Sequence, residues 1–241
     1  MIEKLIKIVF DFIDYVIARQ VPSKLGYGHQ IDSPKVFDQN TFFITSNIEN
    51  MKTTLKIAEL AAGRGALAMK ILEMPHVEYY LACDIDPAGL EVLQKRIKAR
   101  EYASRLETRV MNCLDPQALP ETYFHIVIAD KFLHLLSDEE IEQVFSLANR
   151  LLQPGGIFFV SSASVTNFVY ERTEPGTGHE LYRKLKSDMM TRLWYNINKP
   201  YVFFITEEYI QEIAAKTGFI YKQEAVYNNK ENYLTVALCK K

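Results

Sequence analysis

The chain has 241 residues, of which 48% are hydrophobic and 24% charged, and its formal net charge is −2 at pH 7. This composition is too apolar for a disordered chain, and the length suits one large domain with an accessory segment. Without a global basic field, nucleic acid is disfavoured as the main partner. Cys83, Cys113 and Cys239 match neither a zinc-ligand spacing nor a disulfide framework, so we expect free thiols in a reducing cytoplasm.

Residues 1–20 have helical periodicity, with apolar positions on one face and charged residues elsewhere. The charges interrupt any signal-peptide core or membrane span. We expect this helix to pack over its own domain; binding to a membrane surface, or to a second subunit in a homodimer, is the alternative. Residues 27–50 form an irregular leader that could fold over a ligand site. The predicted division is therefore a leader, 1–50, and a main domain, 51–241.

The segment 55–72 changes from strand to helix through a loop that is almost without side chains. Its pattern predicts a strand at 55–60, a tight loop at 61–65 and a helix at 66–72. Small loop residues let a ligand touch the backbone, and the unpaired N–H groups of the helix N-terminus point into the loop. The segment therefore predicts a binding site for a polar ligand.

Two kinds of cofactor use such a loop. Residues 63–68 also fit the dinucleotide fingerprint G-x-G-x-x-A, so an NAD-dependent reductase is one interpretation. Glu59 stands at the carboxyl end of the strand, where its carboxylate would repel a pyrophosphate but would bind the ammonium group of a zwitterion. Glu59 therefore favours an amino-acid-like cofactor over NAD.

Strand and helix patterns alternate along the rest of the chain. The predicted strands are 55–60, 79–84, 108–112, 124–129, 157–162, 219–227 and 233–239. The predicted helices are 66–72, 87–98, 138–152 and 206–217. Asp86 is an N-cap with Pro87 at the first helical position, and residues 137–140 form a capping box. The turn 154–156 ends the third of these helices.

Five alternations of strand and helix, joined by right-handed crossovers, predict a mostly parallel sheet covered on both faces. The expected fold class is α/β: a Rossmann-like, doubly wound, seven-stranded sheet with a C-terminal antiparallel hairpin strand. An N-terminal helical leader and a cap insertion at about 164–205 complete it. Ligands in such sheets bind beyond the carboxyl ends of the strands.

Five sequence signals follow one another along the chain. They are an acidic, glycine-containing loop at 59–65, an acidic strand end at 84–87, a polar segment at 112–120, a buried strand and its exit at 124–136, and the Leu-Leu-Gln-Pro-Gly-Gly turn at 151–156. Each is common alone, whereas five in sequence are specific. From about Leu55 to the C-terminus the chain resembles the class I S-adenosylmethionine-dependent methyltransferases, and its closing helix and hairpin agree with that family's sixth and seventh strands.

The resemblance implies S-adenosyl-L-methionine as the cofactor. The cofactor-binding residues that it implies are Glu59, Ala61, Gly63, Gly65, Asp84, Ile85, Asn112, Cys113, Leu114, Asp115 and Asp130. Glu59 is placed near the amino-acid portion, and Asp84 accepts both ribose hydroxyls. The family usually has glycine at the position of Ala61, whose methyl group could crowd the methionine moiety and weaken binding.

The adenine site is the segment 112–115 in this resemblance. Asp115, or else Asn112, approaches the adenine amino group, while Cys113 and Leu114 border the ring. The alternative for Asp115 is that it only begins the turn before Pro116.

Asp130 and His134 are the candidate catalytic residues. Asp130 follows the fourth strand, close to where the transferable methyl group should lie, and could hold an amine or deprotonate a hydroxyl. Contact with the cofactor through its backbone, or helix capping, is equally consistent. His134 is surrounded by apolar residues, so a core or supporting histidine is the alternative to a general base. His29 and His179 are weaker candidates for a base.

The insertion 164–205 is rich in aromatic residues and would stand over the substrate site. These residues are Phe168, Tyr170, Tyr182, Trp194, Tyr195, Tyr201, Phe203 and Phe204. They favour a pocket for an apolar or aromatic small molecule, although the same rings could merely bury the cap on the sheet. The turn 174–178 lies within this insertion.

The predicted function is methyl transfer to an oxygen, nitrogen or carbon atom of a small metabolite in the cytoplasm. No metal is expected, because no convincing carboxylate cluster is present. The exit of the fourth strand reads Ala-Asp-Lys-Phe at 129–132, not the Asn/Asp-Pro-Pro-aromatic motif expected for amino groups of nucleic acid or glutamine. The alternatives are a cofactor-binding or partner-binding domain without transfer activity, motivated by Ala61, and the NAD-dependent reductase.

Overall fold

The computed structural model describes residues 39–115, 119, 124–167, 169–186, 201–227 and 233–241. The helix predicted at 1–20, and any dimer contact through it, lies outside these residues. The strands of the main sheet are β1 (Leu55–Leu60), β2 (Val77–Asp84), β3 (Leu106–Val110), β4 (Phe124–Ala129), β5 (Leu152–Ala163), β9 (Phe219–Tyr227) and β10 (Tyr233–Lys240). The α-helices are α2 (Gln39–Glu49), α3 (Ala66–Leu72), α4 (Pro87–Ile97), α5 (Asp138–Leu151) and α7 (Glu207–Lys216).

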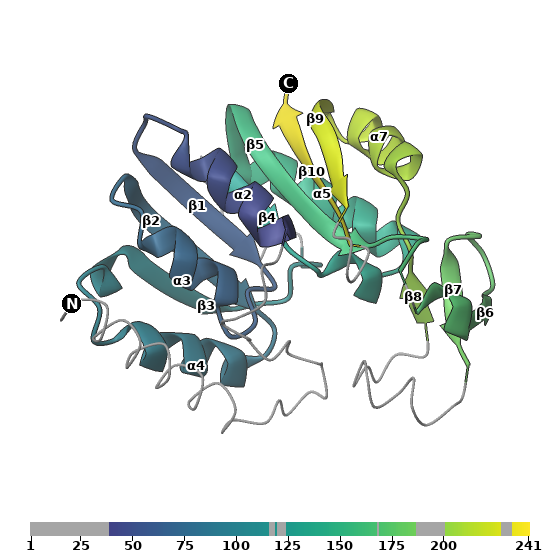
Figure 1. Ribbon diagram of the computed structural model, residues 1–241, viewed down its shortest axis with the longest axis horizontal. Coiled ribbons are helices and arrows are strands. Elements are labelled where there is room, and N and C mark those ends of the chain that lie inside the picture. The colour runs from purple at the N-terminus through teal and green to yellow at the C-terminus, as the bar shows by residue number, and fades with distance from the viewer. Residues whose placement is uncertain (1–38, 116–118, 120–123, 168, 187–200, 228–232) are drawn as a thin grey trace.

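The main sheet has the predicted doubly wound topology (Figure 1). Its seven strands lie in the order β3-β2-β1-β4-β5-β10-β9. Strands β1 to β5 pair in parallel, whereas β10 runs antiparallel to both β5 and β9. The fold class is therefore confirmed, including the antiparallel strand of the C-terminal hairpin. The order reverses between β1 and β4, and the crevice beyond the carboxyl ends at such a reversal is where α/β sheets bind ligands.

The sheet separates two hydrophobic cores. One face packs on α2, α3 and α4 through residues such as Ile44, Ile71 and Leu93, all nearly or fully buried. The other face packs on α5 and α7 through residues such as Phe145 and Ile210. Successive side chains of a strand point to opposite faces, which is why the predicted buried strands are apolar at consecutive positions.

Helix caps fall where the sequence predicts them. The Asp86 carboxylate accepts a hydrogen bond from the backbone N–H of Ala88 at 3.0 Å, with Pro87 at the first helical position. Ser137 and Glu140 form both hydrogen bonds of a capping box at the start of α5. These side chains satisfy donors that the first turn of a helix leaves without partners, so they fix where α4 and α5 begin.

Three elements differ from the sequence prediction. Residues 39–49, expected in an irregular leader, form α2, whose residues Ile44 and Ile48 are buried. Strand β3 occupies Leu106–Val110 and so begins and ends earlier than predicted. Strand β5 begins at Leu152 and continues through the proline and glycines of the expected turn, because Leu152 pairs with Phe124 of β4 before a register shift. Tertiary pairing thus overrides the local turn signal.

The insertion contains a second sheet that the sequence did not indicate. Strands β6 (Thr173–Pro175), β7 (Tyr182–Leu185) and β8 (Tyr201–Phe203) pair antiparallel, and in Figure 1 they lie to one side of the main sheet. Short 3₁₀ helices complete the described chain: η1 (Ala103–Arg105), η2 (Leu133–Leu135) and η3 (Tyr170–Arg172). Among the helices of the described ranges, none has the length and apolar character that crossing a membrane requires.

Candidate active site

The loop after β1 has the left-handed backbone that its small residues allow. Ala61, Gly63 and Gly65 have φ values of 58°, 55° and 75°. Gly65 is constrained by packing as well, because a Cβ atom there would lie 2.2 Å from Cδ1 of Leu93 on α4. The loop is therefore close to the sheet and to α4, and it presents mainly backbone toward the sheet's carboxyl edge.

Asp84, the last residue of β2, holds this loop in place. Its carboxylate accepts hydrogen bonds from the backbone N–H of Gly63 at 2.7 Å and of Asp86 at 2.8 Å. The side chain is only 8% exposed. Each carboxylate oxygen can accept more than one hydrogen bond, so these contacts are compatible with Asp84 also binding a hydroxyl group of a ligand. Asp84 is thus both a support of the loop and a candidate ribose acceptor.

Glu59 is buried near the end of the neighbouring strand β1. The hydroxyl group of Tyr80 donates a hydrogen bond to its Oε2 atom at 2.6 Å. Burial, and then the negative charge of Glu59, holds the pKa of Tyr80 well above its usual value, so Tyr80 remains a donor at neutral pH. The sequence analysis missed Tyr80. Its position in a strand next to the one bearing Glu59 was the available signal.

The segment predicted to flank adenine begins beside Asp84. The backbone N–H of Met111 donates to the carbonyl oxygen of Asp84 at 2.9 Å. Asn112 forms a turn by accepting the backbone N–H of Leu114 on its Oδ1 atom at 3.0 Å. Cys113 lies in this turn, and burial raises the pKa of its thiol to about 12, which makes it unreactive.

Two apolar side chains are exposed at the same edge. Ile85 is 46% exposed and Val110 is 58% exposed, and the β-sheet pairs Val110 with Asp84. Exposed branched side chains next to a buried carboxylate provide an apolar surface for a flat ring. Asp115, the last described residue before a gap, is exposed.

The two candidate catalytic residues, which follow β4, differ in burial. Asp130 is partly buried, whereas His134 in η2 is only 6% exposed. The ring of His134 contacts that of Tyr233 edge-on, with 5.8 Å between the ring centroids. Burial, and then the charge of Lys131, lowers the pKa of His134 to about 4. His134 is therefore neutral at pH 7 and only a weak base.

The described aromatic residues of the insertion pack mainly on one another. Tyr182 stacks on Tyr201 with centroids 5.0 Å apart, and Phe203 contacts Tyr209 of α7 at 4.9 Å. The ring of His179 lies 5.2 Å from that of Phe203. These contacts pack the described rings on one another and on α7, whereas the sequence analysis gave burial on the sheet as the alternative to a substrate pocket. Phe168, Trp194, Tyr195 and His29 lie outside the described residues.

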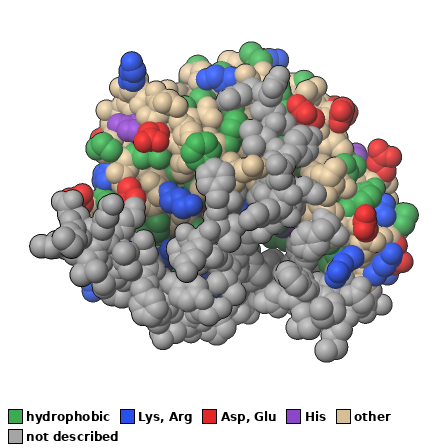
Figure 2. All heavy atoms as spheres, viewed as in Figure 1, with side chains coloured by type: hydrophobic (Ala, Val, Ile, Leu, Met, Phe, Trp, Pro, Cys, Tyr) green, Lys and Arg blue, Asp and Glu red, His purple; other side chains and the backbone are tan. Residues whose placement is uncertain are grey.

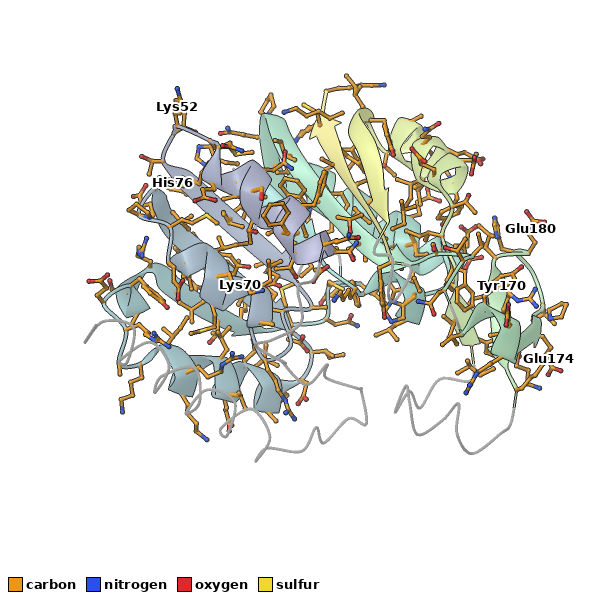
Figure 3. The ribbon with its side chains drawn as sticks, in the orientation of Figure 1. Lys52, Lys70, His76, Tyr170, Glu174 and Glu180 are labelled. Carbon is orange, nitrogen blue, oxygen red and sulfur yellow. The ribbon has the colours of Figure 1, made fainter. Side chains whose placement is uncertain are left out.

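Figure 3 shows how the outer residues of the insertion lie. Tyr170, Glu174 and Glu180 are carried by the second sheet and its connections, well to the side of the strands that carry Glu59 and Asp84. Tyr170 is held by the ring of Phe204 at 5.2 Å and by the guanidinium of Arg183 at 4.4 Å. Within the described ranges, no three His, Cys, Asp or Glu side chains are grouped as metal ligands.

Proteins of known structure share this fold, and a family model matches part of the sequence. The family model described as a methyltransferase domain matches residues 57–156. An O-methyltransferase family protein from Burkholderia thailandensis has a TM-score of 0.60 and 17% identity, over 83% of this chain and 56% of that chain. An S-adenosylmethionine-dependent methyltransferase from Clostridium acetobutylicum has a TM-score of 0.63 and 11% identity, over 86% of this chain and 93% of that chain.

Two further relatives carry more specific names. The glycopeptide N-methyltransferase MtfA, in complex with sinefungin, has a TM-score of 0.64 and 13% identity, over 89% of this chain and 99% of that chain. The reducing polyketide synthase Preu2 of Preussia isomera is 27% identical over 116 residues, which are 47% of this chain and only 5% of that protein.

The fold is that of the class I S-adenosylmethionine-dependent methyltransferases, and residues 57–156 match a methyltransferase domain in sequence. The residues that the family model matches extend from β1 into β5 and therefore include the loop after β1 and the acidic ends of β1 and β2. The resemblance inferred from the sequence is therefore confirmed.

Proposed function

We propose that the protein binds S-adenosylmethionine at the loop after β1 and transfers its methyl group to a small molecule. The pair of buried carboxylates Glu59 and Asp84, at the ends of adjacent parallel strands, is the observation that carries this proposal. One carboxylate suits an ammonium group and the other a pair of hydroxyls, and the left-handed loop between them allows close approach of a ligand to the backbone.

The residues present fit this cofactor better than NAD. A dinucleotide would bring its pyrophosphate toward the buried Glu59, where like charges repel in a poorly screened environment. The sheet also departs from the order 3-2-1-4-5-6 of dinucleotide-binding domains, because the antiparallel strand β10 is inserted between β5 and β9. Both observations favour a zwitterionic adenosyl ligand.

The protein would contribute alignment and exclusion of water. S-adenosylmethionine, when bound, supplies a methyl group already activated by its sulfonium centre. Positioning an acceptor against such a group can be worth roughly 7–11 kcal/mol in favourable cases. The residues that would hold the cofactor are the two carboxylates, the loop after β1 and the turn after β3: Glu59, Ala61, Gly63, Gly65, Asp84, Ile85, Asn112, Cys113, Leu114 and Asp115. Asp130 and His134 would stand on the acceptor side.

The acceptor that we propose is a small metabolite. The relatives include proteins named as O- and N-methyltransferases and a polyketide synthase, which supports small-molecule chemistry without choosing the acceptor atom. On the face drawn in Figure 2, the Lys and Arg side chains of the described part are interspersed with Asp and Glu. This distribution disfavours a nucleic-acid backbone as a ligand.

Calorimetric titration with S-adenosylhomocysteine and with NADH tests the cofactor assignment. We expect binding of the former only; tight NADH binding alone would contradict the proposal. Mass spectrometry of metabolite extracts incubated with S-adenosylmethionine then tests transfer, the expected result being an acceptor that gains one methyl group. Cofactor binding without any methylated product would favour a domain without transfer activity, the second candidate, which Ala61 in its left-handed conformation motivates.

A further inference from the structure

Lys131, Tyr233 and His134 lie together beyond the ends of β4 and β5. The Nζ atom of Lys131 lies 5.4 Å from the centroid of the Tyr233 ring, and the His134 ring lies 5.8 Å from it on an edge-on approach. Tyr233 begins β10 and pairs with Ala163, the last residue of β5. We call these three side chains the cationic cluster.

The backbone of Lys131 is unusual. Its φ of 52° lies in the left-handed region, which residues other than glycine seldom occupy. Such a conformation persists only where surrounding contacts impose it, and it is concentrated at functional sites. The fold therefore places an ammonium group on a strained turn directly after the strand at which the sheet order reverses.

His134 adds a polar atom to the same place. Its Nδ1 atom is buried and has no hydrogen-bond partner among the described residues. A buried polar atom without a partner is destabilising, and a ligand oxygen would remove that cost. This observation is independent of the strain at Lys131 and also points to a ligand.

The cationic cluster and the proposed cofactor site lie at strand ends on the two sides of the sheet reversal. Glu59 and Asp84 end β1 and β2, whereas the cluster lies above β4, β5 and β10. Lys131 lies between Asp130 and His134 in the chain, and the proposed function puts those two residues on the acceptor side. The cluster is therefore assigned to the acceptor side.

We propose that the cationic cluster binds an anionic oxygen of the methyl acceptor, either a carboxylate or an ionised acidic hydroxyl. This inference rests on the methyl-transfer function proposed above. The ammonium group of Lys131 stabilises the anion, the ring of Tyr233 packs beside the acceptor body, and a neutral His134 with its proton on Nδ1 donates a hydrogen bond.

An acceptor that binds as an anion needs no general base. An electron pair of its oxygen forms the bond to the methyl carbon, and the pair of the broken sulfur–carbon bond stays on sulfur. No proton moves within the site, which agrees with a neutral, weakly basic His134.

The probe for this inference is 4-nitrophenol, whose anion absorbs apart from its neutral form. The full chain, saturated with S-adenosylhomocysteine, is titrated near the pH at which half of the free phenol is ionised. We expect the wild-type protein to bind the anion and to lower the apparent pKa of the bound phenol by about one unit. Lys131→Gln should abolish that shift and weaken binding of the anion about tenfold, while binding of the uncharged 4-nitroanisole stays unchanged.

Two variants control for indirect effects. Lys131→Arg keeps the charge and should keep the shift. Lys52→Gln removes an exposed lysine that precedes β1 (Figure 3), at the end of the strand away from the proposed sites. This variant should behave as wild type. A protein that binds S-adenosylhomocysteine but not the phenolate, or an equal shift in the Lys131→Gln variant, would overturn the inference. Failure to bind S-adenosylhomocysteine would instead contradict the proposed function itself.

Discussion

Ala61 carries a conformational cost in the loop on which the proposed cofactor site depends. Its φ of 58° is in the left-handed region, where a Cβ atom is unfavourable and glycine is not. The sequence analysis expected that its methyl group could crowd the methionine moiety and weaken cofactor binding. In the structure the backbone of Ala61 has a conformation that favours glycine, so the energetic cost of the alanine is strain in its backbone torsions.

Ala61→Gly should therefore stabilise the protein, by about 1 kcal/mol or less, because relief of the left-handed alanine outweighs the extra freedom of glycine in the unfolded chain. Urea denaturation measures the free energy of unfolding. The matched control is Ala68→Gly inside α3, which should destabilise by about 1 kcal/mol or more. A loss of stability at both positions would argue against the strained loop.

The double role of Asp84 predicts a large effect on ligand binding. Asp84→Asn removes the charge and one acceptor from the atoms that hold Gly63 and Asp86. We expect the affinity for S-adenosylhomocysteine to fall by roughly 1–3 kcal/mol, measured by calorimetry. Glu78→Gln, an exposed position of the same strand, is the control and should leave the dissociation constant unchanged. An unaltered affinity in Asp84→Asn would contradict the ribose assignment.

At the scale of elements, α5 illustrates how local signals decide where a helix begins. Its capping box is complete, with the Ser137 backbone N–H donating to Glu140 at 2.8 Å and the Glu140 N–H donating to the Ser137 hydroxyl at 3.3 Å. The capping box immediately precedes buried Ile141, so one short segment specifies both the start of α5 and the face that packs on the sheet.

Ser137→Ala should lower the free energy of unfolding by about 1 kcal/mol, because a donor of the first turn loses its acceptor. Ser137→Asp restores an acceptor and should recover most of that stability. Chemical denaturation followed by circular dichroism distinguishes the three proteins. Equal stability of the alanine variant and the wild type would show that other groups already satisfy the first turn.

The insertion shows the limit of element-level reasoning. Its aromatic content was correctly noted, but the three-stranded sheet β6-β7-β8 was not, because strands of three or four residues carry too little periodicity to recognise. Tyr182 of β7 stacks on Tyr201 of β8, and Phe203 of β8 contacts Tyr209 of α7. An aromatic-rich composition is typical both of a substrate pocket and of rings that pack within the protein. Composition alone therefore does not distinguish these two interpretations.

At the scale of the whole molecule, the buried His134 links folding to pH. Its pKa falls from the ordinary 6.5 to about 4 on folding, so the unfolded chain binds the extra proton between these values. The stability associated with the neutral group is present above pH 6.5 and is lost as the pH falls toward 4, to the extent of roughly 3 kcal/mol.

Replacing His134 with Gln should flatten the decline of stability between pH 6.5 and pH 4 relative to the wild type. Urea denaturation at several pH values gives the free energy of unfolding of both proteins. The difference between the two proteins isolates the effect of His134, because the carboxyl groups that also titrate in this range are common to both. His76→Gln, in the turn before β2, controls for the loss of a histidine as such. Parallel pH profiles of wild type and His134→Gln would rule out this linkage.

The sequence by itself determined the order of the main-sheet strands and of the helices between them, the start of α4 and α5, and the acidic ends of β1 and β2. These features together indicated the methyltransferase class. These are local signals, because period, capping and turn chemistry depend on neighbouring residues. It also named Glu59 and Asp84 as candidates before any geometry was known.

Only the tertiary structure decided which side chains meet. Tyr80 reaches Glu59 from the adjacent strand, Tyr233 reaches Lys131 and His134 from nearly the end of the chain, and Leu152 extends β5 through a turn signal. The physical reason is that burial and charge act through space: the pairing of distant strands sets the surroundings of each ionisable group, and those surroundings cannot be computed from sequence neighbours.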